Sequence, residues 1–277
     1  MPELPETETI ARDLDAALAG AVITGTTVTH ADVLRGVSAA DADAAFRDVR
    51  VARVWRRAKL VVCELAGGTV AGGAVLAVQP RFTGALLLDA AAPDDPYVCV
   101  RWSLHDGRVL AYRDVRRLGT VSLFDAQGWH TYQRTLGIEP LDPALTAAEF
   151  SGYVRSSTRA IKAVLMDQRV IAGVGNIYAT EALWGARLDP SRRACDLSTA
   201  EGDRLFDVLR ELLPRAIAAR GTSFRDYRDA HGGRGRFVEQ LQAYGRSGAP
   251  CPRCGARLVG SDAIDGRMTV FCAWCQR

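Results

Sequence analysis

The first eight residues of the chain, MPELPETE, place an amine and two carboxylates at the start of a predicted helix. If Met1 is removed, Pro2 presents a free secondary amine, and Glu3 and Glu6 follow one helical turn apart on one face. An α-amine has a reference pKa near ~8, much closer to neutrality than that of lysine, so it can act as a carbon nucleophile. Pro2, Glu3 and Glu6 are therefore candidates for a nucleophile and its acid–base partners.

The chemistry available to such an amine is attack on an aldehyde-like sugar carbon, which gives an iminium ion. A proline nitrogen has no second proton to lose, so this iminium stays cationic, draws electrons and favours elimination of a neighbouring phosphate. The helix dipole lowers the pKa of the amine whereas Glu3 and Glu6 raise it, so these effects oppose each other. A purely structural role is the alternative, because proline and acidic residues both suit a helix start.

Four of the seven cysteines lie near the C-terminus in two Cys-x-x-Cys pairs, separated by seventeen residues. This spacing is typical of tetrahedral coordination of one structural zinc ion by four thiolates, with free thiols as the alternative. A closed four-thiolate site leaves no position for catalysis. The predicted ligands are Cys251, Cys254, Cys272 and Cys275.

A second binding element is the sequence Ala172-Gly-Val-Gly-Asn176, which precedes a predicted helix. Gly173 and Gly175 allow a tight turn, and the first N–H groups of the helix can then hold a phosphate. The Asn176 amide adds a further donor at that point. A Gly-x-Gly before a helix is weak evidence by itself, so this prediction depends on the rest of the chain.

The predicted secondary structure changes along the chain from mainly strands to mainly helices, which predicts an α+β protein. A helix to about Leu18 precedes a β-sandwich or barrel, with expected strands at Val22–Val28, Val49–Trp55, Leu60–Leu65, Ala74–Val78, Ala85–Leu88, Val98–Leu104, Val109–Tyr112 and Thr120–Phe124. Helices are expected at Ala147–Val154, Arg159–Met166, Asn176–Trp184 and Thr199–Ala219. The expected domains are 1–136 with the sheet, 137–240 with the helices, and 241–277 with the zinc ribbon.

Composition sets limits on the function. The 277 residues are 48% hydrophobic and 24% charged, as is ordinary for a soluble globular protein, and the net charge of +3 does not by itself indicate nucleic-acid binding. The sequence has neither a run of ~18 apolar residues nor a signal-peptide pattern, so we expect a cytoplasmic protein without a membrane partner. Only two of its 35 basic residues are lysines, Lys59 and Lys162.

In their order along the chain, several stretches resemble the formamidopyrimidine-DNA glycosylase family of bacterial repair enzymes, whose relatives include endonuclease VIII. The matching stretches are MPELPE at 1–6, RRAK at 56–59, DVRRLG at 114–119, IKAVLMDQ at 161–168, AGVGNIYATE at 172–181, GTSFRDY at 221–227 and GRMTVF at 266–271. This resemblance covers nearly the whole chain. It implies an N-terminal sandwich, a helix–two-turn–helix domain and a zinc-ribbon hairpin.

The resemblance also implies a role for individual residues. Pro2 would attack C1′ of a flipped damaged nucleotide, with Glu3 as proton donor and shuttle and Glu6 assisting. Lys59 matches an essential lysine on a hairpin that points at the active site. The resemblance implies that Lys59, Asn176 and Arg267 hold the DNA around the lesion, and that Lys162 touches the same backbone.

An enzyme of this kind must extrude a nucleotide and fill the gap that it leaves. The family's usual His-x-Gly-Met-x-Gly reads here Gln79-Pro80-Arg81-Phe82-Thr83-Gly84, so Phe82 stands where methionine normally inserts. Leu118 replaces a phenylalanine in the second insertion loop, whereas Arg116 matches the arginine that faces the orphaned base. The resemblance therefore implies a wedge of altered shape in this chain.

The stretch after the long helix resembles the lesion-capping loop of the branch that removes oxidised purines. Its candidate recognition residues are Thr222, Ser223, Phe224, Arg225 and Tyr227. We therefore expect a monomeric bifunctional glycosylase and AP lyase that acts on damaged double-stranded DNA. Two alternatives stay open: an endonuclease VIII-like enzyme for oxidised pyrimidines, and a non-catalytic protein that binds damaged DNA.

Overall fold

The structure, a computed structural model, describes residues 2–68 and 73–277. Contacts within the chain divide it into two compact units. The sheet unit comprises Met1–Arg134 and Ala219–Val238, and the helical unit comprises Thr135–Ala218 and Glu239–Arg277. The segment Ala219–Val238, called the return segment below, thus belongs with the sheet, whereas the sequence-based division placed it in the helical domain. Met1, whose removal the proposed chemistry needs, lies outside the described residues.

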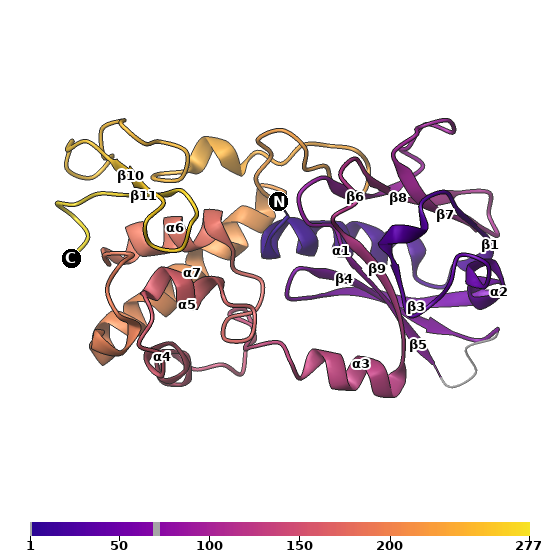
Figure 1. The fold of residues 1–277 in the computed structure, drawn as a ribbon, viewed down its shortest axis with the longest axis horizontal. Helices are drawn as coiled ribbons and strands as arrows, with labels where there is room; N and C mark the ends of the chain where they lie inside the picture. Colours follow the sequence, from indigo (N-terminus) through magenta and orange to yellow (C-terminus); the bar gives the residue numbers. More distant parts are fainter. Residues whose placement is uncertain (1, 69–72) are drawn as a thin grey trace. The chain divides into compact units, whose positions relative to one another are not determined.

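In the described part of the sheet unit, nine strands form one hydrogen-bonded sheet of order β2-β9-β5-β4-β3-β1-β7-β8-β6 (Figure 1). All eight expected strands are present. The additional β2 has two residues and pairs parallel with β9, and it is too short to leave a pattern in the sequence. The strands are β1 Val22–Val28, β2 Leu34–Arg35, β3 Val49–Arg57, β4 Leu60–Ala66, β5 Ala74–Gln79, β6 Gly84–Leu88, β7 Val98–Leu104, β8 Val109–Asp114 and β9 Thr120–Asp125.

Helix α1 (Leu4–Leu18) packs against β3 and β4. Its stripe of Ile10, Leu14 and Leu18 is fully buried, as the i, i+4, i+8 spacing predicts. Buried side chains from β2 and β6, the two edge strands, join this stripe in one hydrophobic core. A sheet whose two ends share a core is folded over on itself, so the expected sandwich is confirmed.

Three short helical segments of the sheet unit were not expected from the sequence: the 3-10 turn at Ala31–Val33, α2 (Ala42–Phe46) and α3 (Ala126–Gln133). Helix α3 begins where the Asp125 side chain accepts a hydrogen bond from the Gly128 N–H. Trp129 is buried, and its ring lies 5.9 Å from that of Trp55 in an edge-to-face contact. This aromatic contact, rather than an apolar stripe, stabilises α3.

The helical unit contains the four expected helices: α4 (Ala147–Arg155), α5 (Ile161–Met166), α6 (Asn176–Ala186) and α7 (Thr199–Ala218). Helices α4 and α6 pack on α7, and α5 packs on α6. The C-terminal hairpin pairs β10 (Val259–Ser261) with β11 (Thr269–Phe271) antiparallel, and 3-10 turns occupy Ala194–Asp196 and Phe237–Gln240. The α+β class is thereby confirmed. None of the helices in the described ranges has the length and apolar character that a bilayer span requires.

Candidate active site and nucleic-acid interface

The acidic start of α1 is a compact and buried structure. Glu3 is the N-cap residue, and its backbone N–H donates to the Glu6 carboxylate at 2.8 Å. Pro2 is buried directly before this cap, and only 2% of Glu3 and 1% of Glu6 are exposed. Carboxylates this deeply buried are uncommon outside ion pairs or functional sites. The predicted nucleophile and its two acidic partners therefore lie in one buried turn.

The return segment reaches back to this turn through Glu6. The second oxygen of the Glu6 carboxylate accepts a hydrogen bond from the Thr222 N–H at 2.7 Å, and the Tyr227 hydroxyl donates to the Glu6 carbonyl at 3.3 Å. Burial and the nearby Glu6 charge raise the pKa of Tyr227, so its hydroxyl remains a donor. Gly221 has φ +80°, and a β-carbon there would lie 2.8 Å from Glu6. These contacts explain why the return segment belongs to the sheet unit.

Gly221 opens the GTSFRDY stretch, but its close approach to Glu6 was not expected from the sequence. Its position after Arg220, at the end of a long helix, is a recognisable signal for a left-handed helix terminus. Arg220 itself binds Asp13 of α1 and Asp229 of the return segment. Such pairing could not be predicted, because Asp13 lies 207 residues away along the chain.

The predicted lesion-recognition residues divide into two groups. Thr222, Ser223 and Tyr227 are buried, and the Ser223 hydroxyl links the Tyr227 carbonyl and the Gly235 N–H, each at 2.9 Å. Phe224 is 48% exposed, and Arg225 has an 84% exposed side chain. The return segment therefore has a hydrogen-bonded base and an exposed tip.

Lys59 lies in the two-residue turn between β3 and β4, after Ala58, which has φ +53°. The Arg56 guanidinium at the end of β3 donates to the Glu8 carboxylate of α1 at 2.9 Å. This ion pair holds the hairpin beside the first turns of α1. Lys59 is 8% exposed, so it is not an ordinary solvated turn residue.

The two predicted insertion loops lie side by side because they extend from the paired strands β6 and β8. The Phe82 loop (residues 79–84) exposes 47% of Phe82, and the Arg116 loop (residues 114–119) exposes 41% of Leu118. The Arg116 guanidinium carbon lies 5.5 Å from the centre of the Phe82 ring, within cation–π range. The structure thus brings two predicted DNA-contacting side chains into direct contact.

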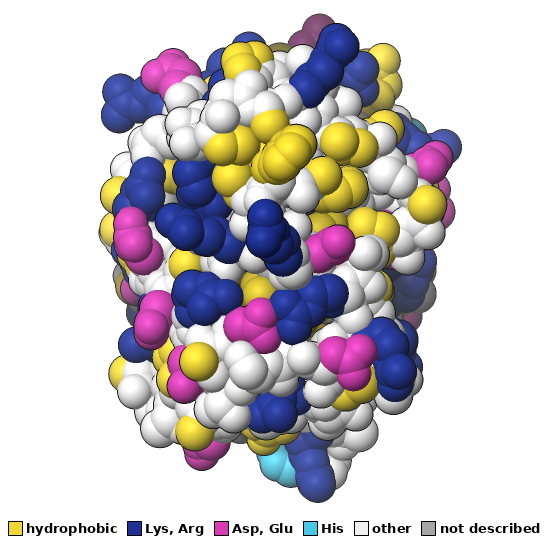
Figure 2. All heavy atoms as spheres, turned by 90° about the vertical axis from the view of Figure 1, so that its left-hand side faces the viewer, with side chains coloured by type: hydrophobic (Ala, Val, Ile, Leu, Met, Phe, Trp, Pro, Cys, Tyr) yellow, Lys and Arg dark blue, Asp and Glu magenta, His cyan; other side chains and the backbone are white. Residues whose placement is uncertain are grey.

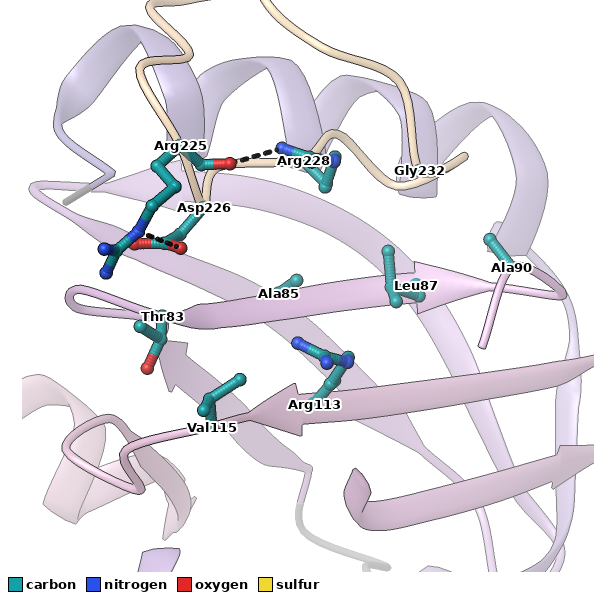
Figure 3. A pocket seen from close by; sticks show the side chains of 10 residues that line it. All are labelled: Thr83, Ala85, Leu87, Ala90, Arg113, Val115, Arg225, Asp226, Arg228 and Gly232. Atoms are coloured by element: carbon teal, nitrogen blue, oxygen red, sulfur yellow. Dashed lines mark hydrogen bonds and ion pairs between the residues drawn. The ribbon is translucent and has the colours of Figure 1, made fainter. Parts of the chain in front are cut away.

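A cavity of about 390 Å³ opens beside these loops within the sheet unit (Figure 3). Its walls are the β6–β8 surface and the return segment. Thr83 follows Phe82 at one end of the cavity, and Arg225 and Asp226 project towards the same end (Figure 3). The lining residues are Thr83, Ala85, Leu87, Ala90, Arg113, Val115, Arg225, Asp226, Arg228 and Gly232.

In the helical unit, Asn176 is the first residue of α6, after the expected glycine turn, in which Gly173 has φ +88°. The Asn176 amide nitrogen donates to the carbonyl of Met268, the neighbour of Arg267, at 3.1 Å. The Arg267 side chain is exposed beside α5, with one Nη 3.9 Å from the Met166 sulfur. Asn176 and Arg267 are therefore brought together, from segments 91 residues apart.

Lys162 occupies a different environment from the other predicted backbone-binding residues. Its side chain is fully buried, and its ammonium group lies 3.1 Å from the Asp265 carboxylate. The same carboxylate accepts a hydrogen bond from the Arg267 N–H at 3.1 Å. Lys162 thus connects α5 to the turn that presents Arg267. Asp265 was missed in the sequence, where an acidic residue in a turn has no distinguishing signal.

The sulfur atoms of Cys251, Cys254, Cys272 and Cys275 lie within 4.8 Å of one another. About 3.8 Å is expected between sulfurs that share a tetrahedral ion with metal–sulfur bonds of about 2.3 Å. The backbone supports the cluster, since the Cys272 N–H donates to the buried Gln276 side chain at 2.8 Å. All four predicted ligands therefore fit one metal ion.

Figure 2 views the side of the molecule on which α4–α6 and the β10–β11 hairpin lie. Lys and Arg side chains form a belt across the middle of this face, with acidic side chains between them. Hydrophobic side chains gather above this belt. Basic side chains are thus prominent on this face, among acidic ones, although the net charge of the chain is mild.

Two family models match this chain. Residues 1–121 match the formamidopyrimidine-DNA glycosylase N-terminal domain, and residues 136–228 match the H2TH domain of the same enzymes. The formamidopyrimidine-DNA glycosylase of Thermomicrobium roseum is 42% identical over 295 residues, which cover 100% of this chain and 99% of that protein.

Solved structures give the same result. Fpg (MutM) from Lactococcus lactis, in complex with DNA that contains an N7-benzyl-Fapy-dG, has a TM-score of 0.89 and 30% identity, with 100% of both chains covered. The same protein with DNA that contains an oxidised pyrimidine has a TM-score of 0.88, with the same identity and coverage. MutM from Thermus thermophilus has a TM-score of 0.86 and 34% identity, covering 99% of this chain and 98% of that one.

Proposed function

Because this chain belongs to the formamidopyrimidine-DNA glycosylase family, we propose that it excises oxidised purines from damaged double-stranded DNA and then cuts the strand by β,δ-elimination. The observation that carries the proposal is the buried link from Glu3 through Glu6 to Thr222. It joins the acidic turn next to the Pro2 amine to the segment that resembles a lesion-capping loop. Reaction chemistry and base recognition would then share one hydrogen-bonded support.

In this mechanism the Pro2 nitrogen attacks C1′, and the bond from C1′ to the base breaks as the new N–C1′ bond forms. The base leaves with the electron pair and takes up the proton that the Pro2 nitrogen loses. Glu3 protonates the ring oxygen of the sugar, the ring opens, and the cationic iminium remains. Loss of a C2′ proton then expels the 3′ phosphate, a second proton loss expels the 5′ phosphate, and water releases Pro2.

Glu6 has a distinct role in this scheme. Its two carboxylate oxygens already accept N–H groups from Glu3 and Thr222. A carboxylate held in this way is well placed to orient Glu3 and poorly placed to act as the main proton shuttle. We therefore assign the proton transfers to Glu3 and the alignment of the site to Glu6.

Oxidised purines are the favoured substrates because the return segment resembles the lesion-capping loop of the branch that removes oxidised purines. Its exposed tip at Phe224 and Arg225 offers backbone and side-chain groups to a damaged purine. Activity on oxidised pyrimidines is the second candidate. Phe82 and Leu118 at the insertion loops favour it, as does the likeness to the Lactococcus lactis protein in complex with an oxidised pyrimidine.

The DNA backbone would be held by Lys59, Asn176 and Arg267. The hydrogen bond from Asn176 to the Met268 carbonyl supports a shared role for Asn176 and Arg267 at one phosphate. Lys162 would act indirectly. Its buried ammonium group binds Asp265 and thereby holds the turn before Arg267. The four-cysteine cluster would bind one zinc ion, which has a structural role because four thiolates leave no open position.

The proposed function is tested by borohydride trapping on matched duplexes that carry 8-oxoguanine, an oxidised pyrimidine, an abasic site or no damage. Reduction of the iminium leaves a covalent protein–DNA adduct that is visible on a gel. We expect adducts at 8-oxoguanine and at the abasic site, and none on intact DNA. Preference for the oxidised pyrimidine would select the second candidate, and the absence of any adduct would refute an iminium mechanism.

An Arg267→Ala variant should bind abasic-site DNA about 10-fold more weakly, because it loses one charge-assisted phosphate contact. The slope of log affinity against log salt should fall by about 1. Arg257→Ala is the matched control, since Arg257 is also an exposed arginine of the cysteine-rich region. If both variants lose the same affinity, Arg267 contributes only general charge and has no place at the damaged site.

A further inference from the structure

A buried carboxylate at the end of β8 connects the two insertion loops. Asp114 is 1% exposed, and its side chain accepts four hydrogen bonds. One oxygen accepts from the Thr83 hydroxyl and from the Arg116 N–H at 3.2 Å. The other accepts from the Tyr112 hydroxyl at 3.1 Å and from the Gly119 N–H at 2.9 Å. This acceptor pattern fits an ionised carboxylate with both oxygens in use.

The four donors come from both loops as well as from β8. Thr83 belongs to the Phe82 loop, whereas Arg116 and Gly119 belong to the Arg116 loop. Thr83 and Val115 lie at the same end of the neighbouring strands β6 and β8 (Figure 3). The Arg116 N–H also donates to the Thr83 hydroxyl at 3.1 Å, so the loops are joined directly and through Asp114.

Two glycines permit this close approach. A β-carbon at Gly119 would lie 2.0 Å from the Tyr112 hydroxyl and 2.5 Å from the Gln79 carbonyl oxygen. One at Gly84 would lie 2.1 Å from the Pro80 carbonyl oxygen. Any side chain at Gly119 would therefore displace the Tyr112 hydroxyl from Asp114. The glycines of both loop motifs are required for the loops to close around the carboxylate.

Tyr112 supports the carboxylate from inside the core. Its side chain is fully buried, and burial together with the adjacent Asp114 charge raises the pKa of its hydroxyl. The hydroxyl thus stays protonated and remains a donor to Asp114. Because Tyr112 belongs to the main hydrophobic core, the hydrogen-bonded group around Asp114 is anchored to the rigid part of the sandwich.

We propose that Asp114 is a positioning residue that fixes the Phe82 and Arg116 loops to each other, so that Phe82 and Arg116 enter the duplex together. This assignment rests on the proposed function, because it takes these two side chains as the ones that fill the extruded nucleotide's place. The cation–π pair of Phe82 and Arg116 is carried by the same two loops whose hydrogen bonds Asp114 accepts. Asp114 itself touches neither DNA nor the reacting atoms in this scheme.

The test compares Asp114→Asn with the wild-type protein on two abasic-site substrates, a duplex and a single strand. Asparagine keeps the shape but replaces one acceptor oxygen with a donor NH₂ group that faces the existing donors. We expect single-turnover cleavage of the duplex to fall ~100-fold, as for other misplaced binding groups, and cleavage of the single strand to change less than about 2-fold. The single strand has no stack to enter, so it needs no wedge.

Asp106→Asn is the matched control, because it removes an exposed aspartate from the turn before β8 in the same unit. It should leave both rates unchanged. A 2-aminopurine opposite the abasic site gives an independent signal of loop insertion, and Asp114→Asn should slow its fluorescence change. A merely structural role would lower both cleavage rates together, and equal rates of wild type and variant on the duplex would also overturn the proposal.

Thr83→Val keeps the test informative if Asp114→Asn fails to fold. It removes one donor to Asp114 and preserves side-chain volume, so its duplex rate should fall about 10-fold while the single-strand rate is retained. Duplex activity equal to wild type would overturn the coupling of the loops. If the wild-type protein cleaves neither substrate, the proposed function fails instead, and that outcome is distinct from failure of the Asp114 assignment.

Discussion

A Pro2→Gly variant should lose at least ~1,000-fold of its single-turnover strand cleavage at an abasic site, because the proposed mechanism takes the Pro2 secondary amine as the nucleophile. Glycine at position 2 still carries an α-amine. That amine lacks the pyrrolidine ring, which fixes the Pro2 nitrogen next to the N-cap residue Glu3. The imine that this primary amine forms can also lose its N–H proton. The neutral imine then withdraws electrons from the sugar less strongly than the cationic iminium of proline does. Rapid-quench gel analysis of cleavage at saturating enzyme measures the loss.

Pro5→Ala is the control for this variant. It removes the same ring from the same helical turn and leaves the Pro2 amine intact, so its cleavage rate should stay within about 3-fold of wild type. Affinity for abasic-site DNA should be similar in all three proteins. Cleavage by Pro2→Gly within tenfold of wild type would show that the attacking group lies elsewhere.

Removal of the proposed zinc ion should abolish specific DNA binding, with a fall in affinity of at least ~100-fold. The region around the cysteines has a very small core, in which Leu258 and Val270 are the buried aliphatic side chains beside the cysteines. So small a core does not hold a hairpin without metal. Loss of the hairpin would release Arg267 and also the Met268 carbonyl that binds Asn176.

Chelation and a Cys272→Ser variant should give the same result, measured by fluorescence anisotropy with damaged DNA and by zinc content. Cys272 is fully buried in the cluster, whereas Cys195 is a partly exposed cysteine outside it. Cys195→Ser should therefore retain zinc and affinity. DNA binding that survives complete zinc loss would contradict the assigned role of the hairpin.

Much of the fold could be predicted because local patterns and tertiary structure agree. The stripe of Ile10, Leu14 and Leu18 is buried as its spacing requires, and the expected strands and main helices are present. Two-residue β2 and helix α3 have no such pattern, since they depend on pairing with β9 and on the contact between Trp55 and Trp129. Their formation is decided by tertiary contacts that no local window contains.

The difference between local patterns and tertiary contacts also applies to the residues of the candidate active site. Pro2, Glu3 and Glu6 lie within five consecutive residues, and their shared buried turn follows from local helix geometry. Asp114 could not be recognised as a centre of four hydrogen bonds, because Thr83 approaches it from 31 residues away. The burial of Lys162 against Asp265 likewise joins positions 103 residues apart. Residue types in the sequence indicated which side chains could react. Only the folded chain shows which neighbouring residues position those side chains.

The central claim is that the Pro2 amine forms the bond to DNA, and the scarcity of lysine makes a direct test possible. With Met1 removed, the amines of this chain are those of Pro2, Lys59 and Lys162. In a Lys59→Arg/Lys162→Arg variant, any borohydride-reduced adduct must therefore lie at the N-terminus, since arginine does not form the imine. We predict that this variant still gives an adduct, even if more slowly, and that peptide mass mapping places it on Pro2. An adduct that peptide mapping places on Lys59 or Lys162 of the wild-type protein would contradict the account.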